Sequence, residues 1–399
     1  MRLYGDKMLI SKRKLNEEIV ILLLFALGGG CIYSYIEVEN TTWLFYFAMM
    51  FIFFIVSFVV ECLKKKSIIQ YCILSVVFSF PMAFRYNMAI DDYSYKRIFT
   101  EISTHEWGYL LSRQEEVGYL IVEKLISILF ADYYINQALI IILPTVLIMI
   151  YVYKNENRIN ITFFFLFFYL VLYYKFMAAG LNRMYIAMTI VLHSYEYLYK
   201  HDLCKYILLV CVASLFHISA LIMLIFIPIV IKDTLDDYVK NWRRYYYIIL
   251  TLLFAMGYSV YNTIANLLSG RYAQYFGAGF SINIDISSLL RIILFLFLIV
   301  LARSKKESNS YINSIFPIYY SSVLVDIFWS NLVLGRVIYY FELAVALSWA
   351  HIITKERKVC NKFVFLTGLS CYLWIIFFAT IIKSERLYDS LFPYISFLQ

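Results

Sequence analysis

The sequence predicts an all-α fold: a polytopic transmembrane helical bundle of about 12–14 membrane segments. Of its 399 residues, 63% are hydrophobic and only 16% are charged, with a mean hydropathy of +0.74. A typical soluble domain has about 45–50% apolar and about 25% charged residues. The apolar residues also gather in stretches long enough to cross a bilayer as helices. With only five prolines and thirteen glycines, collagen-like and low-complexity architectures are excluded.

The composition also excludes several classes of function, namely a soluble enzyme, a disordered chain and a nucleic-acid-binding module. The net charge of +8 comes from 35 basic and 27 acidic residues. In a membrane protein such a surplus collects in cytoplasmic loops, so it predicts no nucleic-acid partner. The cysteines show no CxxC or His/Cys spacing, so neither a disulfide framework nor a metal site is expected. They are Cys31, Cys62, Cys72, Cys204, Cys211, Cys360 and Cys371.

The apolar stretches have roughly the length that a crossing helix needs, with allowance for tilt and local thinning. The segment 116–130 holds Glu123 and Lys124 and has an amphipathic pattern, so we expect it to lie along the membrane surface. The predicted spans are 19–36, 42–60, 67–84, 132–153, 161–177, 184–199, 206–231, 245–265, 288–302, 311–328, 337–353 and 363–382.

The topology depends on the run 206–231, which His217 interrupts. If this run turns back near His217, the inside loops carry 23 Lys and Arg and the outside loops carry 9. A single crossing gives 16 on each side, and a third arrangement, in which 116–130 spans, gives 20 inside and 12 outside. The positive-inside rule favours the turn. Because the run is too short for two full crossings, we predict a broken or re-entrant element that lines a polar cavity.

We predict one integral membrane domain over residues 1–399. It has a cytoplasmic tail at 1–18 and a main extracytoplasmic region at 85–130, with loop and amphipathic-helix character. The basic N-terminus leads into an apolar run without a small-residue cleavage site, which indicates a retained span. The outer loops are mixed in charge and rich in Tyr, and they hold most of the unusual polar residues.

The most unusual stretch runs from Arg85 to Phe99. Two adjacent carboxylates, Asp91 and Asp92, follow the end of a predicted span and stand between Arg85 and the pair Lys96–Arg97. Neighbouring cations can separate the pKa values of two such carboxylates, which suits acid–base chemistry. The alternative is a solvated interfacial loop with Tyr anchors.

Two further arginines, Arg183 and Arg336, stand at the outer starts of predicted spans. A cation is unfavourable at a helix N-terminus, where the dipole prefers an anion. The arrangement is explained if the helix end and the guanidinium together bind an anion such as pyrophosphate. The alternative is an arginine whose charged group reaches the interface.

Three other positions carry candidate chemistry. His217 lies deep in an apolar run, where an ionisable residue indicates a functional site. The alternative is a structural histidine held by hydrogen bonds. The loop 271–279 combines a cation, Tyr272, Tyr275 and two glycines, which suits sugar rings or a plain interfacial loop. Arg291 lies inside a span and is expected to pair with Asp326 or Glu342.

The ordered set of motifs resembles the EpsG family of bacterial polysaccharide proteins and, more broadly, the Wzy-type O-antigen or capsule repeat-unit polymerases. The first family motif reads approximately Arg-x-x-Val-Gly-x-Asp-Tyr-x-x-Tyr. Arg85, Asp91 and Tyr95 fall in register with it, while Ala89 replaces the Gly and Asp92 replaces the first Tyr.

Four later elements follow in the family's order. They are Glu116-Val117-Gly118-Tyr119, Arg183-Met184-Tyr185-Ile186-Ala187, Phe216-His217-Ile218-Ser219-Ala220, and Arg336 with Tyr340 and Phe341. Val117 stands where the family has Pro, and Met184 stands where it has Gln.

The resemblance implies a glycosyltransferase at the outer face of the bacterial cytoplasmic membrane, without cofactor or metal. It would transfer a growing glycan from one undecaprenyl-pyrophosphate carrier onto a repeat unit held on another. Arginines would neutralise the leaving pyrophosphate and a base would deprotonate the acceptor hydroxyl. The expected pyrophosphate residues are Arg85, Arg183 and Arg336; the candidate bases are Asp91, Glu116 and His217; the expected sugar-binding residues are Asp92, Tyr95, Tyr272, Tyr275 and Tyr340.

The expected partners are the lipid-linked donor and acceptor, the bilayer and, in this class of polymerase, a chain-length regulator and a flippase. Two other functions stay open. A lipid-linked oligosaccharide flippase would show two pseudo-symmetric halves with broken spans at matching positions, and the sequence has one candidate break. An O-antigen-ligase type of transferase would use the same donor with a different acceptor.

Overall fold

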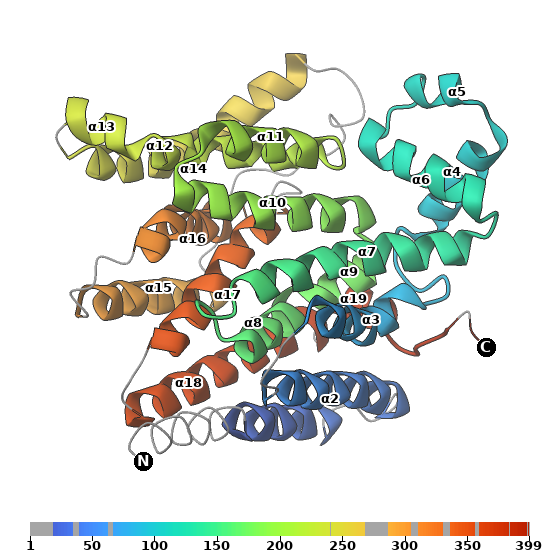
Figure 1. Ribbon diagram of the computed structural model, residues 1–399, viewed down its shortest axis with the longest axis horizontal. Coiled ribbons are helices and arrows are strands. Elements are labelled where there is room, and N and C mark those ends of the chain that lie inside the picture. Colours follow the sequence, from blue (N-terminus) through green and yellow to red (C-terminus); the bar gives the residue numbers. More distant parts are fainter. Residues whose placement is uncertain are drawn as a thin grey trace. The chain divides into compact units, whose positions relative to one another are not determined.

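The computed structural model describes residues 19–34, 40–62, 67–239, 241–267, 286–304, 310–329, 336–355, 359–382, 384–396 and 398. Throughout these ranges the regular elements are helices (Figure 1), which confirms the all-α class. The chain divides into two compact units. Unit 1 comprises Met1–Thr189, Leu215–His217 and Ala350–Gln399, and unit 2 comprises Ile190–Ser214 and Ile218–Trp349. The single integral domain stays a prediction.

Unit 1 contains the N-terminal spans, the region that follows them and the C-terminal helices. Its elements are the helix Ile19–Ser34, α2 (Asn40–Cys62), α3 (Ile68–Ala83), α4 (Asp92–Thr104), α5 (Trp107–Leu111), α6 (Val117–Leu129), α7 (Tyr133–Lys154), α8 (Ile161–Phe167), the π-helical η1 (Phe168–Tyr173), α9 (Tyr174–Ala179), the first residues of α10 (Asn182–Lys200), the last residues of α17 (Ile338–Lys355), α18 (Val359–Phe377), η5 (Phe378–Ile382) and α19 (Glu385–Asp389).

The centre of unit 1 is the continuous helical segment α8–η1–α9. Every residue from Phe163 to Tyr174 is buried, as expected of a helix that is apolar on all sides. Its tyrosine hydroxyls are hydrogen-bonded: Tyr169 donates to the carbonyl of Tyr46 at 3.0 Å, and Tyr173 accepts from the amide of Met82 at 3.1 Å. The central helix is therefore fixed by specific polar contacts as well as by packing.

The region 85–130 folds into α4, α5 and α6, which lie together in Figure 1. The polar side chains of α6 turn inward. Glu123 accepts from Asn136 Nδ2 at 2.9 Å, and Lys124 Nζ donates to the carbonyl of Ile102 at 3.0 Å. The opposite side of α6 exposes the apolar side chains Ile121, Leu125, Ile128 and Leu129. A helix of about 20 Å with such a stripe agrees with a position along the membrane surface.

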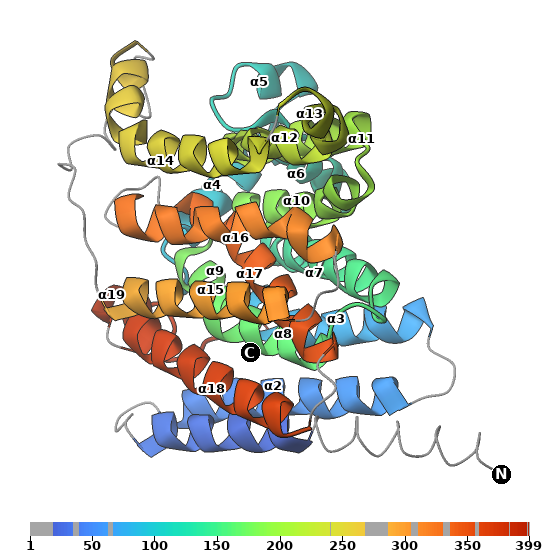
Figure 2. The same cartoon turned by 90° about the vertical axis from the view of Figure 1, so that its left-hand side faces the viewer.

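Unit 2 contains the remaining helices. In Figure 2 α16 lies between α14 and α15. Trp329 Nε1 of α16 donates to the carbonyl of Phe254 in α14 at 3.0 Å, and the rings of Phe295 in α15 and Tyr319 in α16 are 5.1 Å apart. The elements are the rest of α10, α11 (Leu203–Ser214), the 3₁₀ helix η2 (Ile218–Phe226), α12 (Ile227–Val230), α13 (Lys232–Tyr238), α14 (Trp242–Leu267), α15 (Ile286–Ser304), α16 (Ser310–Trp329) and most of α17.

The run 206–231 turns back on itself as predicted. Helix α11 ends at Ser214, the chain turns at Leu215 and Phe216, and η2 begins just after His217. The hydroxyl of Tyr206 donates to the carbonyl of Met223, which brings the two arms side by side. With 12 residues in α11, the first arm is about 18 Å long, less than the roughly 30 Å hydrocarbon core. The first arm is therefore too short for a full crossing, and the re-entrant position in the membrane stays a prediction.

Eleven of the twelve predicted apolar stretches coincide with helical segments, within a few residues at the ends, and the twelfth, 206–231, is divided by the turn at Leu215–His217. Four helical segments are long and apolar enough to cross a membrane, and further apolar helices are shorter. The chain is thus a polytopic helical membrane protein, as predicted. The four segments are Thr41–Val60, Tyr133–Lys154, Ile161–Ala179 and Phe363–Ile382.

Candidate functional site

The loop between α3 and α4 is organised by a buried ion pair. Arg85 donates from its terminal nitrogen to Asp92 at 2.7 Å and from Nε at 3.1 Å, and the side chains are 0% and 1% exposed. Arg85 also donates to the carbonyl of Met82, and Asp92 also accepts from the amide of Ala89. Burial alone would lower the pKa of Arg85, but the charge and hydrogen bonds of Asp92 raise it. The pair therefore holds the loop against the start of α4.

The turn between α9 and α10 closes on the same loop. Gly180 has φ +69°, the left-handed region that favours glycine. A Cβ there would lie 3.1 Å from the Cβ of Ala89 and 3.4 Å from that of Asp91. The amide of Ile90 donates to the carbonyl of Ala178 at 2.9 Å. Arg85 reaches Asn182 Oδ1 at 3.4 Å. These contacts place the first turn of α10, and with it the residue after Asn182, beside the loop.

That residue, Arg183, forms an ion pair with Glu116. A terminal nitrogen of Arg183 lies 2.5 Å from Glu116 Oε2, and the side chains are 19% and 14% exposed. The guanidinium also lies over the ring of Tyr95 at 5.8 Å. Burial raises the pKa of Tyr95, the Arg183 charge lowers it and the Asp91 charge raises it. A cation, a carboxylate and a phenol thus meet at a partly accessible point.

Asp91 and His217 complete the predicted set in unit 1. Asp91 is the half-buried residue that precedes α4, whereas Asp92 points into the interior. Two residues before His217, the carbonyl of Leu215 accepts from the amide of Gly118 at 2.8 Å. The turn that carries half-buried His217 is therefore tied to the first turn of α6, next to Glu116.

The predicted residues of unit 2 form a separate group. Arg336 is exposed just before α17, and Tyr340 is buried in the first turn of that helix. The hydroxyl of Tyr340 lies 3.1 Å from that of Ser219, and its carbonyl accepts from Tyr195. Tyr272 and Tyr275 lie outside the described residues.

Arg291 pairs with both of the carboxylates proposed for it. Its terminal nitrogen contacts Glu342, and its Nε lies 3.5 Å from Asp326. This triad joins α15, α16 and α17 near the end of unit 2 where α17 begins. Buried charges inside a membrane helix need such partners. The prediction that Arg291 pairs with Asp326 or Glu342 is confirmed, with both carboxylates as partners.

Two residues that support the site carried no predicted role. Asn182 links α10 to Arg85, and Gln137 donates from Nε2 to the carbonyls of Ala83 and Arg85 at 3.2 and 2.8 Å. Gln137 is 1% exposed within an apolar span. A polar side chain at that depth was the signal available in the sequence. Within the described ranges, His, Cys, Asp and Glu nowhere gather in a group of three or more that suits a metal ion.

The comparisons with known proteins agree with the motif order. No curated protein and no solved structure matches the chain. The model of the EpsG family matches residues 68–396, which is most of the chain and includes the α3–α4 loop, the Arg183–Glu116 pair, His217 and Arg336. The chain therefore belongs to the EpsG family.

Proposed function

We propose that the chain is a polysaccharide polymerase that joins oligosaccharide repeat units carried on undecaprenyl pyrophosphate at the outer face of the cytoplasmic membrane. Membership of the EpsG family supports a polysaccharide-polymerase type of role. The multi-pass helical membrane fold suits substrates with polyprenyl tails. The observation that carries the proposal further is the ion pair of Arg183 with Glu116 beside Tyr95.

The pair supplies both functions that glycosyl transfer needs. A guanidinium binds the two phosphates of a diphosphate through several N–H donors, and it stabilises the charge that develops as the diphosphate leaves. When Arg183 turns to the diphosphate, Glu116 loses its partner and accepts the proton of the acceptor hydroxyl. The hydroxyl oxygen then bonds to the anomeric carbon, and the bond from that carbon to the pyrophosphate oxygen breaks. Undecaprenyl pyrophosphate leaves with the electron pair.

The other predicted residues take supporting roles in this proposal. Arg85 and Asp92 are closed to substrate in the structure, so we assign them to positioning Asn182 and Arg183 rather than to direct contact. Tyr95 and half-buried Asp91 border the acceptor side. We propose three further roles. His217 would act as a second base, and Arg336 would bind pyrophosphate. The sugar would be bound by three tyrosines, Tyr272, Tyr275 and Tyr340.

The proposal is tested with the purified protein in lipid nanodiscs and its own lipid-linked repeat unit. We expect polymer from the wild-type protein without added nucleotide sugar. Arg183→Gln should abolish it, whereas Arg113→Gln should retain it. Arg113 is the matched control because it is also a part-buried arginine of unit 1, paired with Glu101 and Glu115 rather than with Glu116.

The outcome also separates the alternatives. Transfer to a different acceptor without polymer would mean a ligase. Movement of the lipid-linked unit across a vesicle membrane without any new glycosidic bond would mean a flippase. Either result, obtained with folded protein, overturns the polymerase proposal.

A further inference from the structure

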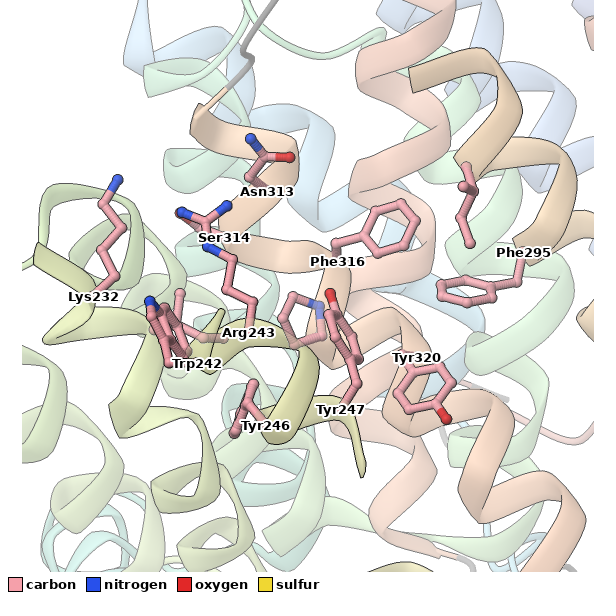
Figure 3. Close-up of a pocket in the computed structure, with 13 residues that line it drawn as sticks. Lys232, Trp242, Arg243, Tyr246, Tyr247, Phe295, Asn313, Ser314, Phe316 and Tyr320 are labelled. Carbon is pink, nitrogen blue, oxygen red and sulfur yellow. The ribbon is translucent and has the colours of Figure 1, made fainter. Parts of the chain in front are cut away.

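Unit 2 contains a cavity of about 600 Å³ at the ends of three helices (Figure 3). Its walls come from the first turns of α14 and α16 and from the second half of α15, with Ile229 of α12 and the first residue of α13, Lys232. Ligand sites usually have volumes of about 300–1,000 Å³, so the cavity has room for part of a lipid. None of the residues discussed for glycosyl transfer lines it.

The polar part of the cavity is cationic. Lys232 and Arg243 both line it. Arg243 has one acidic neighbour, Asp236, at 4.0 Å, and both of these side chains are about half exposed. Asp236 is also held by Trp242 Nε1 at 2.7 Å. Lys232 is half-buried and makes no ion pair within the described ranges. The charged side chains of the lining are thus both cations, although α13 also carries Asp233, Asp236 and Asp237 outside the lining.

The helix ends reinforce the same charge. Neither α14 nor α16 has an acidic residue in its first turn, where the helix dipole favours an anion. The first turn of α14 instead carries Arg243 and Arg244. Asn313 and Ser314 bring polar groups from the start of α16. An anion in the cavity would relieve the mutual repulsion of cations and helix N-termini.

The rest of the cavity is apolar and mostly aromatic. The rings of Phe295 and Phe316 lie 4.9 Å apart, and those of Tyr247 and Tyr320 lie 5.2 Å apart. All four line the cavity (Figure 3). A free inorganic anion would leave this surface bare. An amphiphile would cover both parts, with its charged group on the cations and its chain on the rings.

The cavity lies along the first half of α16, and Arg336 follows the other end of that helix in the sequence. The lining extends along α16 from Asn313 to Tyr320, and the helix ends at Trp329, about 14 Å beyond Tyr320. The loop 232–244 is predicted to be cytoplasmic because it is rich in Lys and Arg. The cytoplasmic leaflet is the one whose anionic lipids attract such basic sites.

From these observations we propose that the cavity binds an anionic phospholipid. The headgroup phosphate lies between Lys232 and Arg243, and an acyl chain lies along Phe295, Phe316 and Tyr320. Basic pockets between membrane helices bind phosphate headgroups by the same combination of charge and apolar contact. The site is independent of the glycosyl transfer proposed above.

The test is native mass spectrometry of the full-length protein titrated with phosphatidylglycerol or phosphatidylcholine. We compare Lys232→Gln/Arg243→Gln with a control that removes the same number of charges, Lys200→Gln/Lys205→Gln. Lys200 and Lys205 are 55% and 60% exposed, and neither lines the cavity. A parallel arm compares the rise in melting temperature that phosphatidylglycerol produces with the rise that inorganic phosphate produces.

We expect one phosphatidylglycerol to bind preferentially to the wild-type and control proteins. Binding should weaken at least about 10-fold in the cavity variant alone, because two headgroup contacts are lost. Inorganic phosphate alone should give no comparable shift in melting temperature. Equal weakening in both double variants would indicate general surface attraction, and an equal shift with inorganic phosphate would indicate a free-anion site. Either result, or the absence of preference for phosphatidylglycerol, overturns the proposal.

Discussion

The guanidinium of Arg183 lies 2.5 Å from the carboxylate of Glu116, although the two residues are 67 positions apart in the chain. Arg183 stands in the first turn of α10, and Glu116 directly precedes α6. The pair is partly accessible, unlike the fully enclosed pair of Arg85 with Asp92. This difference in accessibility determines which variants should affect chemistry and which should affect folding.

Glu116→Gln should abolish polymer formation without unfolding the protein. The amide keeps the size of the side chain but cannot accept a proton from the acceptor hydroxyl, and general base catalysis is worth about 10²–10⁴-fold. The loss of a part-exposed ion pair should cost only about 1 kcal/mol of unfolding free energy. Surface glycan on a gel and the melting temperature measure the two effects.

The control for this variant is Glu115→Gln, one residue away. Glu115 is as buried as Glu116 and is also paired with an arginine, Arg113 at 2.9 Å. It should retain polymer. Equal loss of polymer in both variants would show that the segment, and not the Glu116 carboxylate, is what matters.

Arg85→Met should destabilise the protein by about 3–5 kcal/mol, because it leaves the carboxylate of Asp92 buried without its partner. The double variant Arg85→Met/Asp92→Leu removes both charges and should recover much of that loss. Thermal unfolding in detergent measures both. Polymer formation that follows the recovered stability would mean that the pair matters only for the fold. A stable but inactive double variant would mean that Arg85 itself is required, either through its hydrogen bond to Asn182 or through pyrophosphate.

The sequence predicted the helices well because long apolar runs in a membrane protein leave few alternatives. It also located the turn at His217, where one ionisable residue interrupts an apolar run. It could not show which of the neighbouring carboxylates Asp91 and Asp92 is buried. Asp91 directly precedes α4 and Asp92 begins it, and successive positions at a helix start point in different directions. Asp92 is therefore buried while Asp91 is half-buried.

The three outer arginines looked equivalent in the sequence for a similar reason. Each stands at the end of an apolar run, and the local pattern does not specify a partner far away in the chain. The structure distinguishes them: Arg85 is enclosed, Arg183 is partly accessible and Arg336 is exposed. Their partners depend on tertiary contacts such as the turn at Gly180 against the α3–α4 loop.

Gly118→Ala should disturb the turn that carries His217. The added Cβ would lie 2.8 Å from the carbonyl oxygen of Leu215 and 3.0 Å from its carbonyl carbon, and backbone atoms cannot move aside cheaply. We expect a loss of about 1–3 kcal/mol in unfolding free energy and reduced polymer formation. Gly108→Ala is the matched control, since nothing lies within 4 Å of its Cβ. A fully active Gly118→Ala protein would contradict the close packing of this turn.

Glu123 should make the stability of the protein depend on pH. Burial raises its pKa from 4.5 to about 7, although Tyr119 and Asn136 lower it. Between these values the unfolded chain releases the proton and the folded chain keeps it. Stability should therefore fall as the pH rises from about 4.5 to about 7, and then level off. The total is about 3 kcal/mol.

Glu123→Gln removes that dependence, because the amide stays neutral at every pH. The variant should match the wild-type protein near pH 4.5 and exceed its unfolding free energy by up to about 3 kcal/mol at pH 8. Melting curves of the two proteins across this range supply the measurement. Curves that stay parallel would mean that Glu123 keeps no proton in the folded protein at neutral pH.

The predicted topology is tested by two exposed tyrosines. Tyr93 on α4 is 79% exposed and Tyr238 on α13 is 83% exposed, so the two sites differ little in accessibility. In a cysteine-free background, Tyr93→Cys should react with a membrane-impermeant maleimide on intact cells. Tyr238→Cys should react only after the membrane is permeabilised, because the loop 232–244 is predicted to be cytoplasmic. The reverse pattern would place the Arg183–Glu116 pair on the cytoplasmic side, where it cannot serve a substrate displayed outside. Labelling of both sites on intact cells would instead refute the assignment of the loop 232–244, and with it the leaflet assigned to the phospholipid cavity.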